Sequence, residues 1–268
     1  MHYRLAAAPD STTALSLEFL DARGRVMRTY SSKGTGPARL APKAGLNAFT
    51  WDLRRDAPTS LQGVLLFGAP SGGGAKVPPG RYTVRLTMGA VTQSQAFDVG
   101  PDPRLEPIPA AVLAERDSLA TLLVTRIGEI HDAVLRVRDM KTQVTGIVSR
   151  TRDVPMADSI GVAGRSLTAK ADTLDPAMTT KAANGQDIIN YANGINGQFG
   201  FLLGQLEGHP GVTQPVRERL AELEREWAAL RARVTTFETV DVQAFNQLLE
   251  RAGVPGLIPK TPKPKVVM

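Results

Sequence analysis

The first hundred residues alternate hydrophobic and polar side chains with the period of two that is typical of half-buried β-strands. In residues 15–19, for example, Leu15, Leu17 and Phe19 alternate with Ser16 and Glu18. Six further segments have a similar pattern, at residues 3–7, 26–30, 49–53, 64–67, 82–88 and 93–99. Turn-forming sequences separate several of them, at residues 21–24, 44–47 and 78–80. This arrangement predicts an N-terminal Ig-like antiparallel β-sandwich over residues 1–100.

A proline-rich segment ends this pattern. Pro101 and Pro103 fit neither a central strand nor a helix interior, so we expect residues 101–109 to form a hinge between two domains. Few contacts usually cross such a hinge. The sequence therefore predicts that the two domains are separable and that a protease would cut between Gly100 and Pro109.

Beyond the hinge, hydrophobic residues recur every three or four positions, which is the period of an amphipathic helix. The stripe between Leu119 and Ile147 predicts one helix of about 40 residues. A nearly unbroken heptad between Val216 and Phe237 predicts another long helix. Weaker stripes predict helices near residues 156–167 and 188–206, and a short helix at 242–251 that stops at Gly253 and Pro255.

Short connections near Asp175-Pro176 and at residues 209–211 would place successive helices antiparallel to one another. We therefore predict an antiparallel helical bundle of about four helices over residues 110–258. A Lys/Pro-rich flexible tail is expected over residues 259–268. The glycines at 194, 197, 200 and 204 each cost about 1 kcal/mol in a helix, so we expect a neighbouring helix to approach closely there.

The net charge of the chain and its distribution do not change the predicted fold. The chain has a net charge of +6, and residues 1–104 hold 13 Lys and Arg against 7 Asp and Glu, whereas the remainder is balanced. The arginines are dispersed and carry no nucleic-acid motif, so we expect no nucleic-acid partner. No window is apolar enough to span a membrane, and the chain has no cysteine. No signal peptide is recognisable, and because strand pattern begins at the first residues, we expect a fragment of a larger protein.

Candidate chemistry is sparse. The three histidines, His2, His131 and His209, lie far apart and have no metal-ligand spacing, so no metal site is predicted. His131 next to Asp132 could act as a tuned base, but partly buried packing is the favoured interpretation. His209 is expected at a helix end, and His2 in a frayed terminus.

The glycine-rich segment 68–76 differs from a phosphate-binding loop in two ways. Ala75, rather than glycine, precedes Lys76, and a strand rather than a helix follows. We interpret it as a mobile inter-strand loop. No Gly-x-Ser-x-Gly elbow is present, and the acids of the fourth helix, among them Glu218, Glu222, Glu224 and Glu226, are expected on its solvated face.

The tryptophans are expected in the two cores. Trp51 has the same register as Phe49 and Leu53, whereas Thr50 and Asp52 should face water. Trp227 occupies a core position of the heptad. With no catalytic, cofactor-binding or metal-binding residue identified, we expect no enzymatic activity and no cofactor.

Three segments carry a family resemblance. Residues 15–30 with the Asp21–Gly24 turn, Gly45-Leu-Asn-Ala-Phe-Thr-Trp-Asp-Leu-Arg54, and Pro79-Gly-Arg-Tyr-Thr-Val-Arg-Leu-Thr87 together resemble the Ig-like domain of the flagellar hook-capping type. A second resemblance is to the C-terminal region of bacterial sortilin-like, BNR-repeat β-propeller proteins of the sialidase-like glycosyl hydrolase type. It is carried by Trp51-Asp52-Leu53-Arg54, the glycine-rich insertion, Val99-Gly-Pro-Asp-Pro-Arg104 before a long helix, Asn190-Tyr191 with Ile195-Asn196, and residues 244–255.

The resemblance implies a non-catalytic accessory module in the C-terminal part of a larger exported β-propeller protein. It implies a periplasmic, cell-surface or secreted location, with the upstream β-propeller domain or another protein as partner. The alternative is a supporting domain of a secreted sialidase-like glycoside hydrolase that contributes to substrate binding. A carbohydrate ligand would follow from that alternative, and no residue of this chain supports it.

Overall fold

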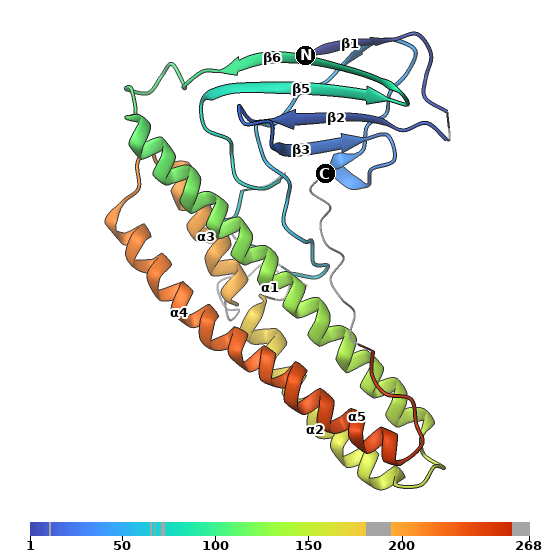
Figure 1. Cartoon of the computed structure of the whole chain (residues 1–268). Coiled ribbons are helices and arrows are strands. Elements are labelled where there is room, and N and C mark those ends of the chain that lie inside the picture. Colours follow the sequence, from blue (N-terminus) through green and yellow to red (C-terminus); the bar gives the residue numbers. More distant parts are fainter. Residues whose placement is uncertain (11, 65, 67, 71–72, 181–193, 259–268) are drawn as a thin grey trace.

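The computed structural model describes residues 1–258 apart from residues 11, 65, 67, 71–72 and 181–193. Two antiparallel β-sheets form its N-terminal part, and an elongated group of helices packs below them (Figure 1). The prediction of antiparallel strands followed by a set of helices is therefore confirmed. The predicted tail over residues 259–268 lies outside the described residues.

The described strands form two sheets. The first pairs β1 (His2–Leu5) with β4 (Gly45–Ala48). The second has the order β3-β2-β5-β6 and consists of β3 (Val26–Ser31), β2 (Leu15–Leu20), β5 (Gly80–Met88) and β6 (Val91–Val99). All of these pairs are antiparallel.

One hydrophobic core draws on both sheets. The alternation in β2 is confirmed, because Leu15, Leu17 and Phe19 are at most 1% exposed. Leu5 of β1 joins them, together with residues from the connecting segments and from β3 and β5, namely Tyr30, Leu40, Trp51, Val77 and Tyr82. The two sheets are thus held together by burial of apolar surface.

Polar side chains define the turns between these strands. The carboxylate of Asp21 accepts hydrogen bonds from the backbone N–H groups of Arg23 and Arg25, each at 2.9 Å, while Gly24 has a φ of +77°. The Tyr82 hydroxyl donates to the Pro78 carbonyl at 2.7 Å. The turns predicted at residues 21–24 and 78–80 therefore have local physical causes.

Two strand predictions are wrong in detail. Residues 49–53 form no strand, because the strand lies earlier, at β4, and Leu53 takes a positive φ of 58° that turns the chain away. Trp51 still points into the core. Within residues 64–67, the described Val64 and Leu66 belong to no named strand, and Leu66 packs against the helical core instead.

The helices follow the predicted stripes closely. They are α1 (Ala110–Arg150), α2 (Ala157–Met178), α3 (Ile195–Gly208), α4 (Gln214–Thr236) and α5 (Val242–Arg251), and one π-helical turn (Phe237–Asp241) links the last two. The long helix α1 has 41 residues. All seven heptad positions predicted between Val216 and Phe237 are buried.

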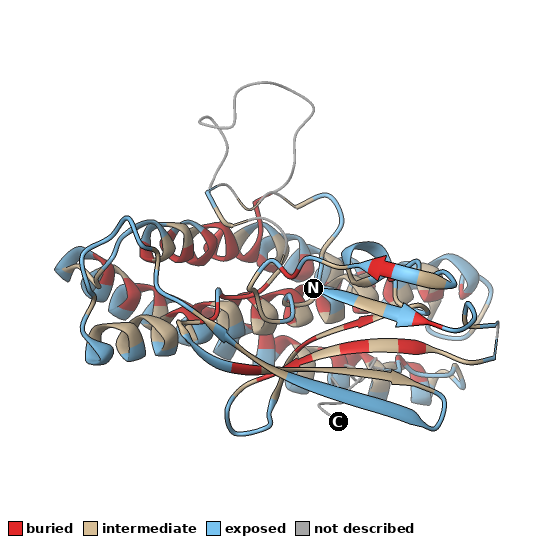
Figure 2. Cartoon of the chain, turned by 90° about the horizontal axis from the view of Figure 1, so that it is seen from above, coloured by how far each residue is buried: buried red, intermediate tan, exposed pale blue. Residues whose placement is uncertain are grey.

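The arrangement of these helices differs from a simple four-helix bundle. In Figure 1, α2 lies beside the lower half of α1, α3 lies beside its upper half, and α4 runs along both. Helices α2 and α3 therefore follow one another along the same return path, and each packs against its own half of α1. Figure 2 shows the buried residues gathered on the sides where the helices face one another.

Two helix boundaries need correction. Asp175 and Pro176 lie in the last turn of α2 rather than in a connection, since the helix ends only at Met178. The proline lacks the N–H that would bond to the carbonyl four residues earlier, and the helix ends two residues after it, at Met178. Ile188 and Tyr191, which we expected at the start of the third helix, lie outside the described residues.

Candidate functional site

The segment between β4 and β5 leaves the sheets and packs against the helices (Figure 1). Ala75 is 1% exposed and belongs to the helical core, and Leu61 and Leu66 pack against the same core. The connection between two strands is thus part of the interior of the bundle. This interface is where polar groups from distant parts of the sequence meet.

One ion pair crosses this interface with two parallel hydrogen bonds. The Arg54 guanidinium donates to both carboxylate oxygens of Glu207 in α3, at 3.1 and 2.7 Å. The backbone N–H of Lys76 donates to the same carboxylate at 2.9 Å. The two charged side chains are only 12% and 11% exposed, so solvent screens their attraction weakly.

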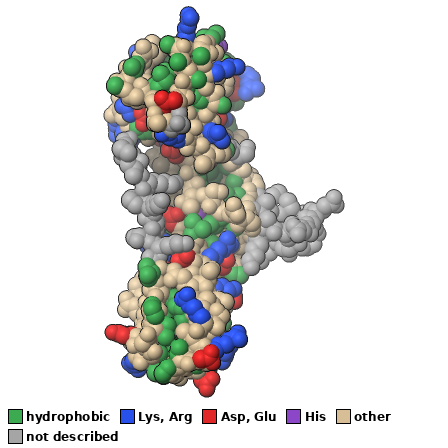
Figure 3. Space-filling model, turned by 90° about the vertical axis from the view of Figure 1, so that its right-hand side faces the viewer, with side chains coloured by type: hydrophobic (Ala, Val, Ile, Leu, Met, Phe, Trp, Pro, Cys, Tyr) green, Lys and Arg blue, Asp and Glu red, His purple; other side chains and the backbone are tan. Residues whose placement is uncertain are grey.

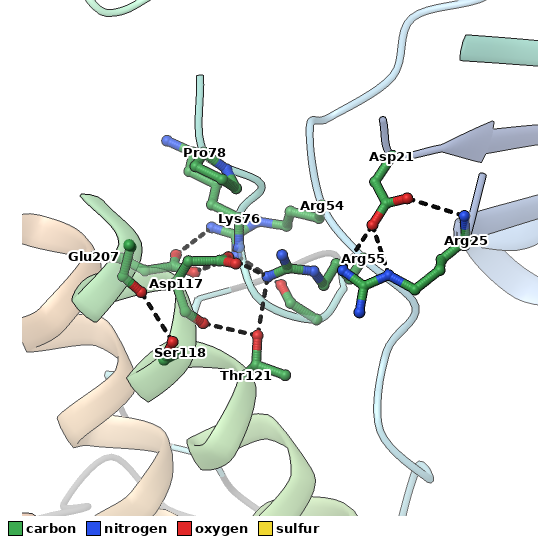
Figure 4. A network of polar contacts seen from close by, with 12 residues as sticks. Asp21, Arg25, Arg54, Arg55, Lys76, Pro78, Asp117, Ser118, Thr121 and Glu207 are labelled. Atoms are coloured by element: carbon green, nitrogen blue, oxygen red, sulfur yellow. Dashed lines mark hydrogen bonds and ion pairs between the residues drawn. The ribbon is translucent and has the colours of Figure 1, made fainter. Parts of the chain in front are cut away.

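A second ion pair lies close by on α1. The Arg55 guanidinium is 2.6 Å from the Asp117 carboxylate and donates to the Thr121 hydroxyl at 3.1 Å. Figure 4 shows Arg54 and Arg55 reaching from the β-sheet side towards α3 and α1 respectively. Adjacent arginines therefore bind two different helices.

A buried histidine extends the interface. The Nδ1 atom of His131 in α1 lies 2.5 Å from the Thr59 carbonyl oxygen, and its Nε2 atom lies 3.2 Å from the Asn196 side-chain amide of α3. The Thr59 hydroxyl donates to Asp132 at 2.6 Å. Because a carbonyl can only accept and an amide NH₂ can only donate, this geometry fits a neutral imidazole with its proton on Nδ1.

The environment of His131 favours the neutral ring. Burial lowers the pKa of His131 below its usual value, although the hydrogen bond to Thr59 and the charge of Asp132 act in the opposite direction. His131 is 3% exposed and Asn196 is fully buried, so neither presents a surface to a substrate. The interpretation of His131 as packing, rather than as a base, agrees with this geometry.

The glycines of α3 have a different partner from the one we predicted. A Cβ at Gly204 would lie 2.0 Å from the Gly68 carbonyl oxygen, and one at Gly200 would lie 3.0 Å from the Ala69 Cβ. At Gly200 and Gly204 the close approach is therefore made by the segment between β4 and β5. At Gly194 it is made by Thr179, directly after α2, since a Cβ there would lie 2.3 Å from the Thr179 backbone. Because glycine has no Cβ, the backbone of residues 68 and 69 can pack directly on α3 at Gly200 and Gly204.

These contacts join the two parts of the chain more closely than we expected from the proline-rich segment. The proline-rich segment does lie between Val99, where β6 ends, and Ala110, where α1 begins. However, the interface is formed by residues 54–76, far from that segment in sequence. Its ion pairs, apolar contacts and buried hydrogen bonds make separation costly.

The prediction for His209 is confirmed, whereas the prediction for His2 is wrong. His209 follows α3, and its Nδ1 accepts a hydrogen bond from the Gly211 backbone N–H at 3.1 Å, as expected for a helix end. His2 is exposed but is not frayed, because it pairs with Ala48 in the first sheet. Among the residues that the structure describes, no three potential metal-binding side chains cluster.

The glycine-rich segment is held in place where it is described. Gly74 donates to the Arg55 carbonyl at 2.9 Å and accepts from the Arg54 side chain at 3.0 Å. A Cβ at Gly74 would lie 2.2 Å from the Asp56 carbonyl oxygen. The segment connects two strands, as expected, but residues 73–76 are held by these contacts and do not form a free loop. Residues 71–72 lie outside the described residues.

The tryptophans occupy the two cores as predicted. The Trp51 ring stacks on Phe19 with centroids 4.3 Å apart, and its indole N–H donates to the Arg54 carbonyl at 3.0 Å. The Trp227 indole N–H donates to Glu129 at 3.1 Å. Both side chains are below 8% exposed, so neither offers a platform to a ligand.

The acidic residues of α4 form more ion pairs and hydrogen bonds than predicted. Glu224 accepts from Arg126 of α1 at 2.8 Å, while Glu222 and Glu226 both pair with Arg219. Glu218 accepts from Gln214. The solvated face is thus a network of ion pairs and hydrogen bonds.

A groove lies between α3 and α4. It has a volume of about 400 Å³, and Phe201, Leu202, Pro215 and Val216 line it together with Arg219. The guanidinium of Arg219 is already bonded to Gln198 and to two glutamates. Among the described residues, no group with catalytic chemistry converges on this groove.

The surface charges are also dispersed. On the face drawn in Figure 3, basic side chains are scattered over the upper and lower parts of the molecule, with acidic side chains among them mainly in the lower part, and they form no continuous patch. In the described part of the chain, no helix combines the length and the apolar character needed to cross a bilayer. Searches against family models, curated proteins and solved structures gave no match for this chain.

His131 and Asp132 were sequence candidates, but the ion-paired residues of the interface were not. Arg54 and Glu207 are separated by 153 positions, and no local pattern connects them. Two signals were available, however. The glycines of α3 marked a close approach, and the long connection after β4 exceeded what a simple strand turn needs.

Proposed function

We propose that this chain is a non-catalytic interaction module in which the β-sheets and the helices act as one rigid unit. The interface carries the proposal. His131, Asp117, Asp132 and Glu207, the groups best suited to catalysis, bond to the connection between β4 and β5. His131 is buried, and the three carboxylates are partly buried and already bonded to another part of the same chain. These groups therefore hold the two parts together and are not free to act on a substrate.

The finer assignments are also part of this proposal. We propose that the two sheets correspond to an Ig-like sandwich of the hook-capping type, and that the chain is the C-terminal part of an exported sortilin-like, BNR-repeat protein. The turn at Asp21, the core position of Trp51 and the Tyr82–Pro78 hydrogen bond support the first assignment, because each gives a structural role to a residue of the resemblance. The partner would be the β-propeller encoded upstream.

A glycoside assay tests the absence of catalysis. The purified chain is incubated with aryl glycosides, including sialosides, and we expect no turnover above buffer. Turnover that disappears in the variants Asp132→Asn or Glu207→Gln would overturn the proposal. Binding of the upstream polypeptide in gel filtration tests the partner, and failure of the two to associate would contradict that assignment.

A further inference from the structure

Strand β6 forms an open edge of the larger sheet. It is paired only with β5, in an unbroken register from Gly80↔Val99 to Met88↔Val91 (Figure 1). Its first five residues, 91–95, are all exposed, so both of its faces meet solvent there. A nine-residue strand with one free side is a template for another strand.

The hairpin geometry determines which backbone groups point outwards. Two residues, Gly89 and Ala90, join Met88 to Val91, and in such a hairpin the closing pair is hydrogen-bonded. Odd-numbered residues of β6 therefore bond to β5, and the N–H and C=O groups of Thr92, Ser94, Ala96 and Asp98 face away from the sheet. A side chain already reaches this free side, since Gln95 donates to the Ala96 carbonyl at 3.1 Å.

The opposite edge of the same sheet is covered. On β3, the Met27 carbonyl accepts from the Asp56 N–H at 2.9 Å, and the Ser31 carbonyl accepts from the Leu40 N–H at 2.8 Å. Strand β6 has no such cover among the described residues, and it contains no proline, lysine, arginine or bulge. The features that usually prevent edge pairing are therefore missing from β6.

We infer that β6 pairs with β6 of a second copy of this chain, antiparallel, about a two-fold axis at Gln95. In this register Thr92 faces the partner's Asp98 and Ser94 faces the partner's Ala96, and the reciprocal pairs complete the set. All four of these residues have outward backbone groups. With the two-fold axis at any other residue of β6, fewer of these four residues would lie opposite a residue with outward backbone groups.

The side chains fit the same axis. Val91, which is 61% exposed, would lie opposite the partner's Val99, so two apolar residues would cover each other. Asp98 would lie opposite a threonine, and because it is the only charged residue of β6, no like charges meet. Gln95 would face its own copy, where two amides can exchange hydrogen bonds. The strand is therefore complementary to itself.

This inference deepens the proposed interaction role, on which it rests, by naming one partner as a second copy. The test is sedimentation velocity of the full chain at concentrations up to about 1 mM, a range that detects weak dimers. Wild type is expected to show a monomer–dimer equilibrium. The variants Gln95→Lys and Gln95→Glu should each weaken dimerisation about fivefold, because like charges would meet at the axis.

An equimolar mixture of the two variants should recover dimerisation, since Lys and Glu would then face each other. Gln93→Lys and Gln93→Glu are the matched controls, because residue 93 faces Phe97 of the partner subunit in this register, and their mixture should bring no recovery. Ser94→Pro removes an outward N–H that is not bonded to β5 and should abolish dimers, with circular dichroism confirming the fold.

A wild type that stays monomeric throughout would overturn the inference, and so would recovery in the residue 93 mixture or none in the residue 95 mixture. A monomer whose β6 instead takes up a different extended peptide would also overturn it. The glycoside assay and upstream binding are independent of these outcomes, so the proposed function could stand while this pairing fails.

Discussion

Trp51 combines a ring contact and a hydrogen bond at the centre of the β core. Its ring stacks on Phe19, meets Tyr82 edge-on at 5.8 Å, and is 7% exposed. Thr50 and Asp52 on either side of it are more exposed, as the alternation predicted. However, Asp52 also accepts a hydrogen bond from the Arg54 N–H at 3.1 Å, so it is more than a solvated charge.

Replacing Trp51 with alanine should cost about 3–5 kcal/mol of unfolding free energy, because the lost burial and the new cavity add. Urea unfolding of the full chain, followed by far-UV circular dichroism, measures this loss. Leu46→Ala is the control, since Leu46 is 68% exposed and its truncation should change stability by less than about 0.5 kcal/mol. Equal losses for the two variants would contradict the core assignment.

His131 makes stability depend on pH in a defined window. Burial lowers its pKa in the folded chain, whereas the unfolded chain protonates at the ordinary value near 6.5. The unfolded state therefore binds more protons below about pH 6.5, and stability should fall with falling pH by at most about 1.4 kcal/mol per unit. Asp132 and Arg138 are the charged groups that influence the ring, with opposite effects.

The variant His131→Gln should be less stable at pH 7 but should lose the slope below about pH 6.5. His209→Gln, at an exposed helix end, should keep the wild-type slope. Urea midpoints measured in half-unit steps of pH give both results. If His131→Gln has the same slope as wild type, the histidine is not the group responsible.

At the level of elements, the sequence predicts helices better than strands. The heptad of α4 predicts which residues are buried because its apolar positions all lie on one face of the helix. The strand predicted at residues 49–53 fails for a different reason. Alternation of apolar and polar residues predicts which side chains are buried, and Trp51 is indeed buried. It does not show that the backbone belongs to a sheet, and here the positive φ of Leu53 turns the chain away from both sheets.

Helix α3 allows a test of the loop packed on it. Gly204→Ala would place a methyl group 2.0 Å from the Gly68 carbonyl, so backbone must move and we expect a loss of about 1–3 kcal/mol. Gly208→Ala in the same helix meets nothing within 4 Å and should stabilise by at most about 1 kcal/mol. Thermal unfolding of both variants measures the difference. A stabilising Gly204→Ala would show that the loop does not pack there.

Across the whole molecule, the interface could not be read from the sequence. Its contacts join residues far apart along the chain, such as Arg55 with Thr121 and Thr59 with His131. Periodicity within an element says which face is buried, but it does not say what covers that face. The proline-rich segment therefore separates the strands from the helices along the sequence. In the folded chain, however, side-chain contacts pack the strands and the helices together.

This packing predicts that a cut in the proline-rich segment leaves the two halves together. With a protease site inserted between Asp102 and Glu106, we expect the cleaved chain to elute as one species and to unfold in a single transition. The reason is that the Arg54–Glu207 pair, the Arg55–Asp117 pair and the apolar contacts of Ala75 do not involve that segment.

Glu207→Gln should weaken this association, because it leaves the nearly buried Arg54 without its charged partner, at a cost of roughly 2 kcal/mol. Glu222→Gln is the control, since its pair with Arg219 is about half exposed and lies outside the interface. The cleaved Glu207 variant should therefore dissociate at lower urea than the cleaved Glu222 variant. Separation of the two cleaved halves in buffer alone, with Glu207 intact, would mean that the contacts of residues 54–76 do not hold the molecule together.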